Sequence, residues 1–321
     1  MDNFTHSLTG WALGQAGLKS KTRKGLAALI LGANMGDIDV FFGSVPWEPL
    51  AMHRGFTHSL VGGLAVMPPL LFGLLLLLDR WQVARGTRFR SGLPLDKAWL
   101  LALCYLGALT HPLLDLQTTY AVQLLSPFSG AWFHADSLFI IDVWLWSLLS
   151  LAIAWSRMQE KRGQEWRLVP LAALGAGLAY ILFNIGLSDT ARERLLRRAP
   201  RADAIFASPD PVRSWRRTVV WREDGAYRWA GFSPLAGLGP SYGPIHPGLD
   251  HPLVREARRR DPGLRRFLGW SVLPFAWAER RRCGILVSVG DARYLSPVGY
   301  SRLKHETAIP RPCLPTAGSE R

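Results

Sequence analysis

Long apolar runs separated by short polar turns dominate the first half of the chain. Four of these runs are close to the ~20 residues that a helix needs to cross the core of a bilayer. They cover residues 56–78, 98–116, 138–155 and 168–187. The pattern predicts a mainly α-helical, polytopic membrane bundle with four spanning helices.

Two shorter apolar runs, 4–18 and 25–34, come before these spans and are joined by a basic turn at 19–24. At ~15 and ~10 residues they are short for full crossings, so we expect a re-entrant or tilted hairpin packed against the bundle. The chain start has no basic region and no Ala-x-Ala-like cleavage site, so we expect the first run to be retained rather than removed as a signal peptide.

Charge is distributed unevenly along the 321 residues. The hydrophobic content of 49% and mean hydropathy of +0.09 would on average also suit a soluble protein. Residues 1–188, however, hold only 14 Lys/Arg and 11 Asp/Glu, against 24 and 13 in residues 189–321. We therefore predict a helical membrane domain at 1–188 and a basic extramembrane domain at 189–321.

The second domain has the pattern of a small α+β unit of mainly antiparallel strands. Runs 218–223 and 226–232 are rich in β-branched and aromatic residues and flank Asp224-Gly225, which predicts a hairpin. We expect the same arrangement around Gly290-Asp291, and a helix in the Arg-rich segment 252–266. An apolar, aromatic piece follows at 267–277.

The basic charge and the cysteines of this domain bear on its partners and compartment. Excess positive charge favours anionic membrane lipids, and no recognised nucleic-acid motif accompanies it, so we expect no specific nucleic-acid binding. Cys283 and Cys313 could pair but need not. The glycine-rich segments lack phosphate-loop spacing and no Gly-x-Ser-x-Gly motif occurs, which disfavours nucleotide-binding and serine-hydrolase functions.

The connecting loops predict an orientation. Basic residues crowd the first and third loops between the predicted spans, at 80–97 and 157–167, whereas the loop 117–135 has no Lys or Arg. By the positive-inside rule the first and third loops are cytoplasmic and the second lies outside. Four spans then place the C-terminal domain on the non-cytoplasmic side as well.

Histidine and aspartate residues gather at the ends of the apolar runs that this orientation places outside. His111 and Asp115 are four residues apart, so both project from one helix face and could chelate one ion. Singly, such residues could equally mark a helix kink, a cap or a solvated loop. As a set on one membrane face they predict a metal site, because mixed imidazole and carboxylate ligands suit divalent ions, zinc above all. The predicted ligands are His6, Asp37, His53, His58, His111 and Asp115.

Three further residues are candidates for the chemistry. We predict that Asp39 and Asp136 either orient imidazoles or act as the general base. Arg54 could neutralise a phosphate oxygen, or it could instead pair with lipid headgroups.

The order of these motifs resembles a known family. It comprises Thr5-His6-Ser-Leu-Thr-Gly10, Gly36-Asp37-Ile-Asp39, His53-Arg-Gly-Phe-Thr-His58-Ser59 and His111-Pro-Leu-Leu-Asp115 with Thr118-Thr-Tyr120. It is similar to the YdjM/YbcI-type family of LexA-regulated inner-membrane proteins over residues 1–190. Gly36 departs from the family pattern, which usually has proline there, and this could loosen the turn before Asp37.

The resemblance implies a metal-dependent hydrolase of the bacterial inner membrane, related remotely to zinc phospholipase C and P1-type nucleases, helical enzymes that cleave phosphoesters. We expect one to three divalent ions and a phosphoester or lipid-linked substrate at the outer face.

Two other functions are alternatives to the hydrolase. A transporter predicts ionisable groups spread through the bilayer depth, and a non-catalytic scaffold predicts a His/Asp set that does not converge.

Overall fold

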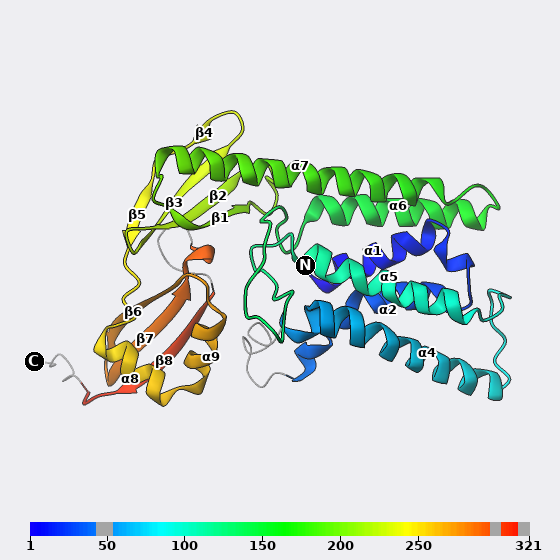
Figure 1. Ribbon diagram of the computed structural model, residues 1–321, viewed down its shortest axis with the longest axis horizontal. Helices are drawn as coiled ribbons and strands as arrows, with labels where there is room; N and C mark the ends of the chain where they lie inside the picture. The colour runs from blue at the N-terminus through cyan, green and yellow to red at the C-terminus, as the bar shows by residue number, and fades with distance from the viewer. Residues whose placement is uncertain (43–53, 296–302, 314–321) are drawn as a thin grey trace, which may run out of the picture.

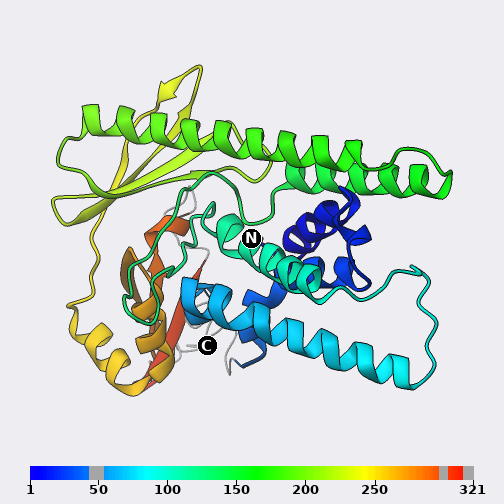
Figure 2. The same cartoon turned by 45° about the vertical axis from the view of Figure 1, so that its right-hand side comes forward.

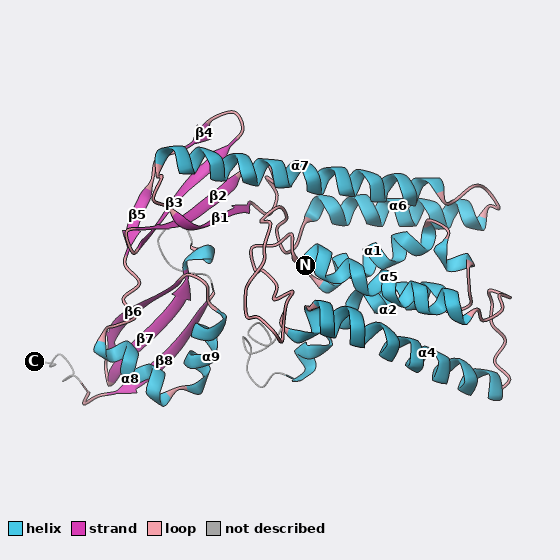
Figure 3. Ribbon diagram, in the orientation of Figure 1, coloured by secondary structure: helices cyan, strands magenta, loops and turns pink. Residues whose placement is uncertain are grey.

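The computed structural model describes residues 1–42, 54–295 and 303–313. A bundle of helices occupies one side of the molecule and a β-rich unit the other, with the longest helix, α7, running along both (Figure 1). Within the described residues, every strand follows α7 in the sequence (Figure 3). The chain is therefore mainly helical, with a small C-terminal β-sheet region, in line with the predicted fold class.

The two short apolar runs form the expected helical hairpin, α1 (Asn3–Gln15) and α2 (Gly25–Asn34). Asp2 caps α1, because its side chain accepts hydrogen bonds from the backbone N–H groups of Phe4 and Thr5. Between the two helices lies a basic turn that contains the 3₁₀ helix η1 (Leu18–Ser20). Neither helix is long enough to cross a membrane.

The hairpin packs inside the bundle against α5 (Lys97–Asp115). The approach of α2 to α5 is close at Gly107, where a Cβ would lie only 2.6 Å from the carbonyl oxygen of Leu29. Small residues at such contacts let helix backbones approach each other within a membrane.

Three helical segments of the described residues are long and apolar enough to cross a membrane, namely Leu60–Ala84, Lys97–Asp115 and Leu168–Arg198. The first joins a π-helical turn, η4 (Leu60–Val66), to α4 (Met67–Ala84); the other two are α5 and α7. Two short 3₁₀ segments precede the first span, η2 (Met35–Phe42) and η3 (Phe56–His58). Three of the four predicted spans thus correspond to helices of suitable length and composition.

The structure does not support the third predicted span, at 138–155. The corresponding helix, α6 (Val143–Lys161), begins later because Asp142 caps its first turn, accepting from the backbone N–H of Leu145. Its last turns are polar, which lowers its apolar length. Asp142 also accepts a hydrogen bond from the Tyr180 hydroxyl at 2.9 Å, which supplies the partner that a carboxylate in an apolar run needs.

The basic turns of the bundle lie together at one end, away from the β-rich unit (Figure 2). Lys19, in the turn between α1 and α2, pairs with Glu160 of α6, with Nζ 2.5 Å from Oε2. Arg23 of the same turn pairs with Asp79 of α4, with Nη2 2.7 Å from Oδ2. These ion pairs hold the cationic ends of the hairpin, α4 and α6 at the same level.

The first C-terminal sheet has the order β1-β2-β3-β4, with β5 also paired to β3. The strands are β1 (Asp203–Pro209), β2 (Arg217–Glu223), β3 (Ala226–Ser233), β4 (Gly237–Leu238) and β5 (Tyr242–Ile245). The predicted Asp224-Gly225 hairpin is confirmed, with Glu223 opposite Ala226. Both turn residues have positive φ, 51° and 75°, as a tight two-residue hairpin turn requires.

Helix α7 (Leu168–Arg198) continues without a break across the predicted domain boundary at residue 188. Its last turns cover the five-stranded sheet, where Ala191 and Leu195 pack against Val219 and Trp221. One helix therefore contributes first a candidate membrane span and then part of the C-terminal core.

The second sheet has the order β6-β7-β8, formed by β6 (Pro274–Arg281), β7 (Gly284–Asp291) and β8 (Lys304–Pro310). The prediction of a hairpin turn at Gly290-Asp291 is wrong. Gly290 lies within β7, paired with Phe275 on one side and Lys304 on the other. Asp291 ends the strand and caps the 3₁₀ helix η5 (Ala292–Tyr294).

The Arg-rich segment is two helices rather than the one predicted at 252–266. α8 (Pro252–Arg260) ends at Asp261, whose side chain caps α9 (Pro262–Trp270). The predicted apolar piece 267–277 is divided between α9 and β6. Cys283 and Cys313 form a disulfide at the edge of this sheet.

Candidate metal centre

Four His and Asp side chains from separate elements meet at the end of the bundle opposite the basic turns. Asp37 lies in η2, His58 ends η3, and His111 and Asp115 lie in the last turns of α5. All four are buried, and one ligand atom of each lies within 4.8 Å of the others. The group could hold a metal ion.

The atoms of this cluster are spaced as ligands of one ion. His58 Nε2 lies 3.4 Å from Asp37 Oδ1 and 3.2 Å from Asp115 Oδ2. His111 Nε2 lies 3.5 Å from each of the same two oxygen atoms. Four ligands at ~2.0–2.2 Å from a tetrahedral zinc ion stand about 3.3–3.6 Å apart. These four His–Asp separations therefore fit the ligands of a single ion.

The tautomer of His111 adds a second argument. Its Nδ1 is 2.7 Å from the backbone carbonyl oxygen of Ala33. A carbonyl oxygen only accepts hydrogen bonds, so the neutral ring carries its proton on Nδ1 and a lone pair on Nε2. That lone pair faces oxygen atoms of Asp37 and Asp115 in a buried site, an arrangement that a shared cation stabilises.

The Nδ1 side of the His58 ring contacts a hydroxyl group that is hydrogen-bonded to a carboxylate. Its Nδ1 is 3.0 Å from Thr57 Oγ1, which donates a hydrogen bond of 2.5 Å to Asp39 Oδ2. Burial lowers the pKa of His58, favouring the neutral ring that binds metals. The backbone N–H of Arg54 also donates to Nδ1, at 3.2 Å, which suits a proton on Nε2. An ion bound at Nε2 would instead require the proton on Nδ1, where the Thr57 hydroxyl oxygen can accept it. Asp39 thus lies where it can orient a ligand imidazole, one of the two roles predicted for it.

His6 lies beside the four-residue group rather than within it. Its Nε2 is 3.5 Å from Asp115 Oδ1, the carboxylate oxygen on the side away from His58. Its ring stacks on His111 with the centroids 4.0 Å apart. The structure therefore brings together five of the six predicted ligands, while His53 lies outside the described residues.

Arg54 contacts the cluster rather than the membrane surface, since its side chain is only 1% exposed. Nη2 lies 3.3 Å from Asp115 Oδ1, and Nη1 donates a hydrogen bond of 2.8 Å to Thr118 Oγ1. The guanidinium lies 5.2 Å above the centre of the Tyr120 ring. The alternative in which Arg54 pairs with lipid headgroups does not fit these contacts.

Gly36 has a steric role that differs from the predicted loosening of its turn. A Cβ at this position would overlap the imidazole ring of His111. The bare backbone therefore leaves the space that the ring occupies beside Asp37.

Asp136 is not brought into the cluster. It is fully buried between α7 and β1, where it pairs with His134 and with Arg192, whose Nη2 is 2.7 Å from Oδ2. It also accepts from the backbone N–H of Ala207. Burial alone would raise the pKa of Asp136, but these partners lower it to about 2. Its described contacts suit a structural junction rather than the predicted role of general base or ligand-orienting residue.

Sequence reasoning missed three parts of the site. The Ala33 carbonyl, the Tyr120 ring below Arg54 and the Met1 amino group, which pairs with Asp115, all contact site residues. The Ala33 carbonyl is a backbone group of a kind that every residue has, so nothing in the sequence marks it. Tyr120 could have been found from its place two residues after Thr118 in the family pattern.

Comparison with known proteins identifies the family. No curated protein and no solved structure matches the chain, so the remote likeness to phospholipase C and P1 nuclease gains no support. The family model described as YdjM inner membrane protein matches residues 1–186, which include every residue of the cluster. The chain therefore belongs to the YdjM inner membrane protein family.

Proposed function

We propose that this membrane protein is a metal-dependent hydrolase that cleaves a phosphoester or lipid-linked phosphate at the non-cytoplasmic face. The observation that supports it most is the spacing of 3.2–3.5 Å between the His58 and His111 nitrogens and the Asp37 and Asp115 oxygens. Buried imidazoles and carboxylates in this arrangement are typical ligands of zinc.

The chain's own residues have separable roles in this proposal. Asp37, His58, His111 and Asp115 hold the ion, which when bound lowers the pKa of water toward ~7 and polarises a phosphoryl oxygen. The Ala33 carbonyl keeps His111 in the tautomer that presents Nε2, and the Thr57 hydroxyl can accept the Nδ1 proton of His58 when Nε2 binds the ion. Asp39 accepts the hydrogen bond of the Thr57 hydroxyl and through it orients the His58 imidazole.

Arg54 determines the charge of the substrate in this proposal. A divalent ion balances the charges of Asp37 and Asp115, and the guanidinium beside Asp115 offsets the charge of Asp39. In a water-poor site, the ion and the guanidinium can then attract an anion such as a phosphate group. His6, stacked on His111 beside the second oxygen of Asp115, completes the wall of the site.

Two observations support the non-cytoplasmic side. The basic turns lie at the end of the bundle opposite the cluster, and basic loops favour the cytoplasm. The Cys283–Cys313 disulfide lies in the unit beside the cluster end, and disulfides persist in oxidising compartments.

The two alternative functions fit the geometry less well. A transporter needs ionisable groups along the bilayer depth, whereas the described His and Asp ligands gather at one end of α5. A scaffold without a site predicts scattered residues, and these converge. Measuring both metal content and activity separates a purely structural metal ion from a catalytic one.

The test uses full-length protein purified in detergent. We compare its zinc content and its hydrolysis of bis(p-nitrophenyl) phosphate with those of His58→Ala, Asp115→Ala and the control His134→Ala, whose imidazole pairs with Asp136 away from the cluster. The proposal expects near-stoichiometric zinc and chelator-sensitive hydrolysis in the parent and control, and loss of both in the two cluster variants. Zinc without hydrolysis would support a structural ion, and zinc retained in both variants would contradict the site.

A further inference from the structure

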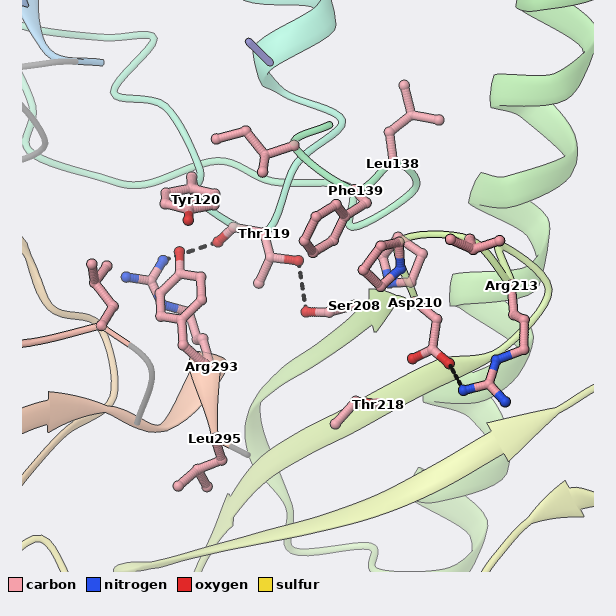
Figure 4. Close-up of a pocket in the computed structure, with 16 residues that line it drawn as sticks. Thr119, Tyr120, Leu138, Phe139, Ser208, Asp210, Arg213, Thr218, Arg293 and Leu295 are labelled. Atoms are coloured by element: carbon pink, nitrogen blue, oxygen red, sulfur yellow. Dashed lines mark hydrogen bonds and ion pairs between the residues drawn. The ribbon is translucent and has the colours of Figure 1, made fainter. Parts of the chain in front are cut away.

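A cavity of about 550 Å³ lies where the bundle's outer loops meet the C-terminal unit (Figure 4). One wall is formed by Thr119 and Tyr120, after α5, together with residues 138–140 before α6. The other wall comes from the turn after β1 and from Tyr294 and Leu295. This volume lies within the ~300–1,000 Å³ typical of small-molecule sites.

The charged groups that line this cavity are already paired. Arg293 is fully buried, with Nη2 2.9 Å from Asp291 Oδ2, and it donates to the Thr119 carbonyl at 3.0 Å. Arg213 at the rim pairs with Asp210, 3.1 Å away. The remaining wall is largely aromatic and aliphatic. The described lining therefore offers little net charge to a ligand and suits an apolar group.

Two parts of the wall contact residues that pair with Asp115 of the metal centre or adjoin them. The Tyr120 ring lies beneath Arg54, whose guanidinium pairs with Asp115. The carbonyl oxygen of Ile140 accepts the backbone N–H of Asp2 at 3.2 Å, next to the Met1 amino group that contacts Asp115. A ligand in the cavity thus shares walls with the site that would hold a phosphate.

We propose that this cavity binds the alkyl chain of an amphiphilic phosphoester whose phosphate group lies at the metal centre. The inference rests on the proposed function and names its substrate class, a chain-bearing phosphoester rather than a small polar one. The aromatic and aliphatic wall of the cavity would shield such a chain from water.

The first test locates the chain without requiring turnover. Full-length protein in detergent is photolysed with octyl phosphate that carries a diazirine at the end of the chain, and labelled peptides are mapped by mass spectrometry. The proposal expects labelling of 138–140 and the turn after β1 that excess octyl phosphate removes and that excess inorganic phosphate reduces, because both compete for the metal centre. Labelling only of the apolar faces of α4 and α7, as for any detergent, would overturn it.

The second test changes the cavity alone. Val212→Trp fills its rim, and Leu235→Trp, on a fully exposed turn of the same unit, is the matched control. We expect Val212→Trp to raise KM for octyl p-nitrophenyl phosphate roughly tenfold or more, because apolar contact is lost. KM for methyl p-nitrophenyl phosphate should be unchanged in both variants.

The outcomes separate this inference from the function on which it rests. Equal effects of Val212→Trp on both esters, or none on either, would overturn the chain site while leaving the hydrolase intact. Absence of metal-dependent hydrolysis with either ester would contradict the proposed function, yet labelling of the cavity would still support a chain site.

Discussion

At the residue scale, the metal centre depends on groups that do not touch the ion. Thr57 links the His58 imidazole to Asp39. Thr57→Val removes that hydroxyl while keeping the shape, so we expect metal affinity to fall about 10–100-fold, as for other lost partners of ligand histidines. Competition with a zinc-binding dye measures this affinity. Thr57→Ser should restore most of the affinity, and equal affinity in Thr57→Val and the parent would contradict the role.

Gly36 gives a steric prediction at the same scale. Gly36→Ala places a methyl group where the His111 ring lies, so the ring must move away from Asp37 and zinc affinity should fall at least about tenfold. Gly73→Ala in α4, where a Cβ meets nothing within 4 Å, is the control. Zinc binding that is equal in both variants would show that His111 is not fixed by this contact.

How far the sequence could predict these residues depends on the kind of contact. The four-residue spacing of His111 and Asp115 on one helix predicts their shared face from the chain alone. The placement of Arg54 needed tertiary structure, because a basic residue near a membrane suits headgroups equally well. Asp136 shows the same limit, since its Arg192 partner is 56 residues away in the sequence.

At the element scale, the sequence predicted an element correctly where its turn residues and its hydrophobic periodicity agreed. The Asp224-Gly225 hairpin has a two-residue turn with both φ values positive, which its sequence favours. Gly290-Asp291 carries a similar signal but lies in a strand, because pairing of β7 with both β6 and β8 outweighs the turn preference. The end of an apolar run also does not fix the end of a helix. The predicted span begins at residue 138, but α6 begins only after its cap, Asp142.

Asp261 gives a prediction for a single helix end. It caps α9 and accepts hydrogen bonds from Thr307 and His305 of β8. Burial raises the pKa of Asp261, but these hydrogen bonds lower it to about 2. Because the folded pKa lies below the ordinary value of 3.8, the stabilisation that Asp261 supplies is present above pH ~3.8 and is lost as the pH falls toward ~2.

Asp261→Ala should therefore lower the free energy of unfolding by about 1 kcal/mol near neutral pH, with a smaller difference near pH 2. Thermal unfolding of the full chain in detergent, at several pH values, measures this. A difference between variant and parent that stays constant across that range would contradict the lowered pKa.

At the scale of the whole molecule, one end of the bundle is basic and the other holds the cluster and the C-terminal unit (Figure 1). The proposed topology predicts which end is accessible. In intact cells, a membrane-impermeant maleimide should label Leu235→Cys but label Ser91→Cys only after permeabilisation. The native thiols interfere little, because Cys104 is buried and the other two are paired. The reverse labelling pattern would place the cluster in the cytoplasm.

The most direct measurement of the central claim is zinc K-edge X-ray absorption of the full-length protein. The proposed site predicts nitrogen and oxygen ligands at ~2.0–2.2 Å, with imidazole scattering that is lost when His58 and His111 are both replaced by alanine. An unchanged spectrum in that double variant, or sulfur ligands near ~2.3 Å, would show that the metal binds elsewhere.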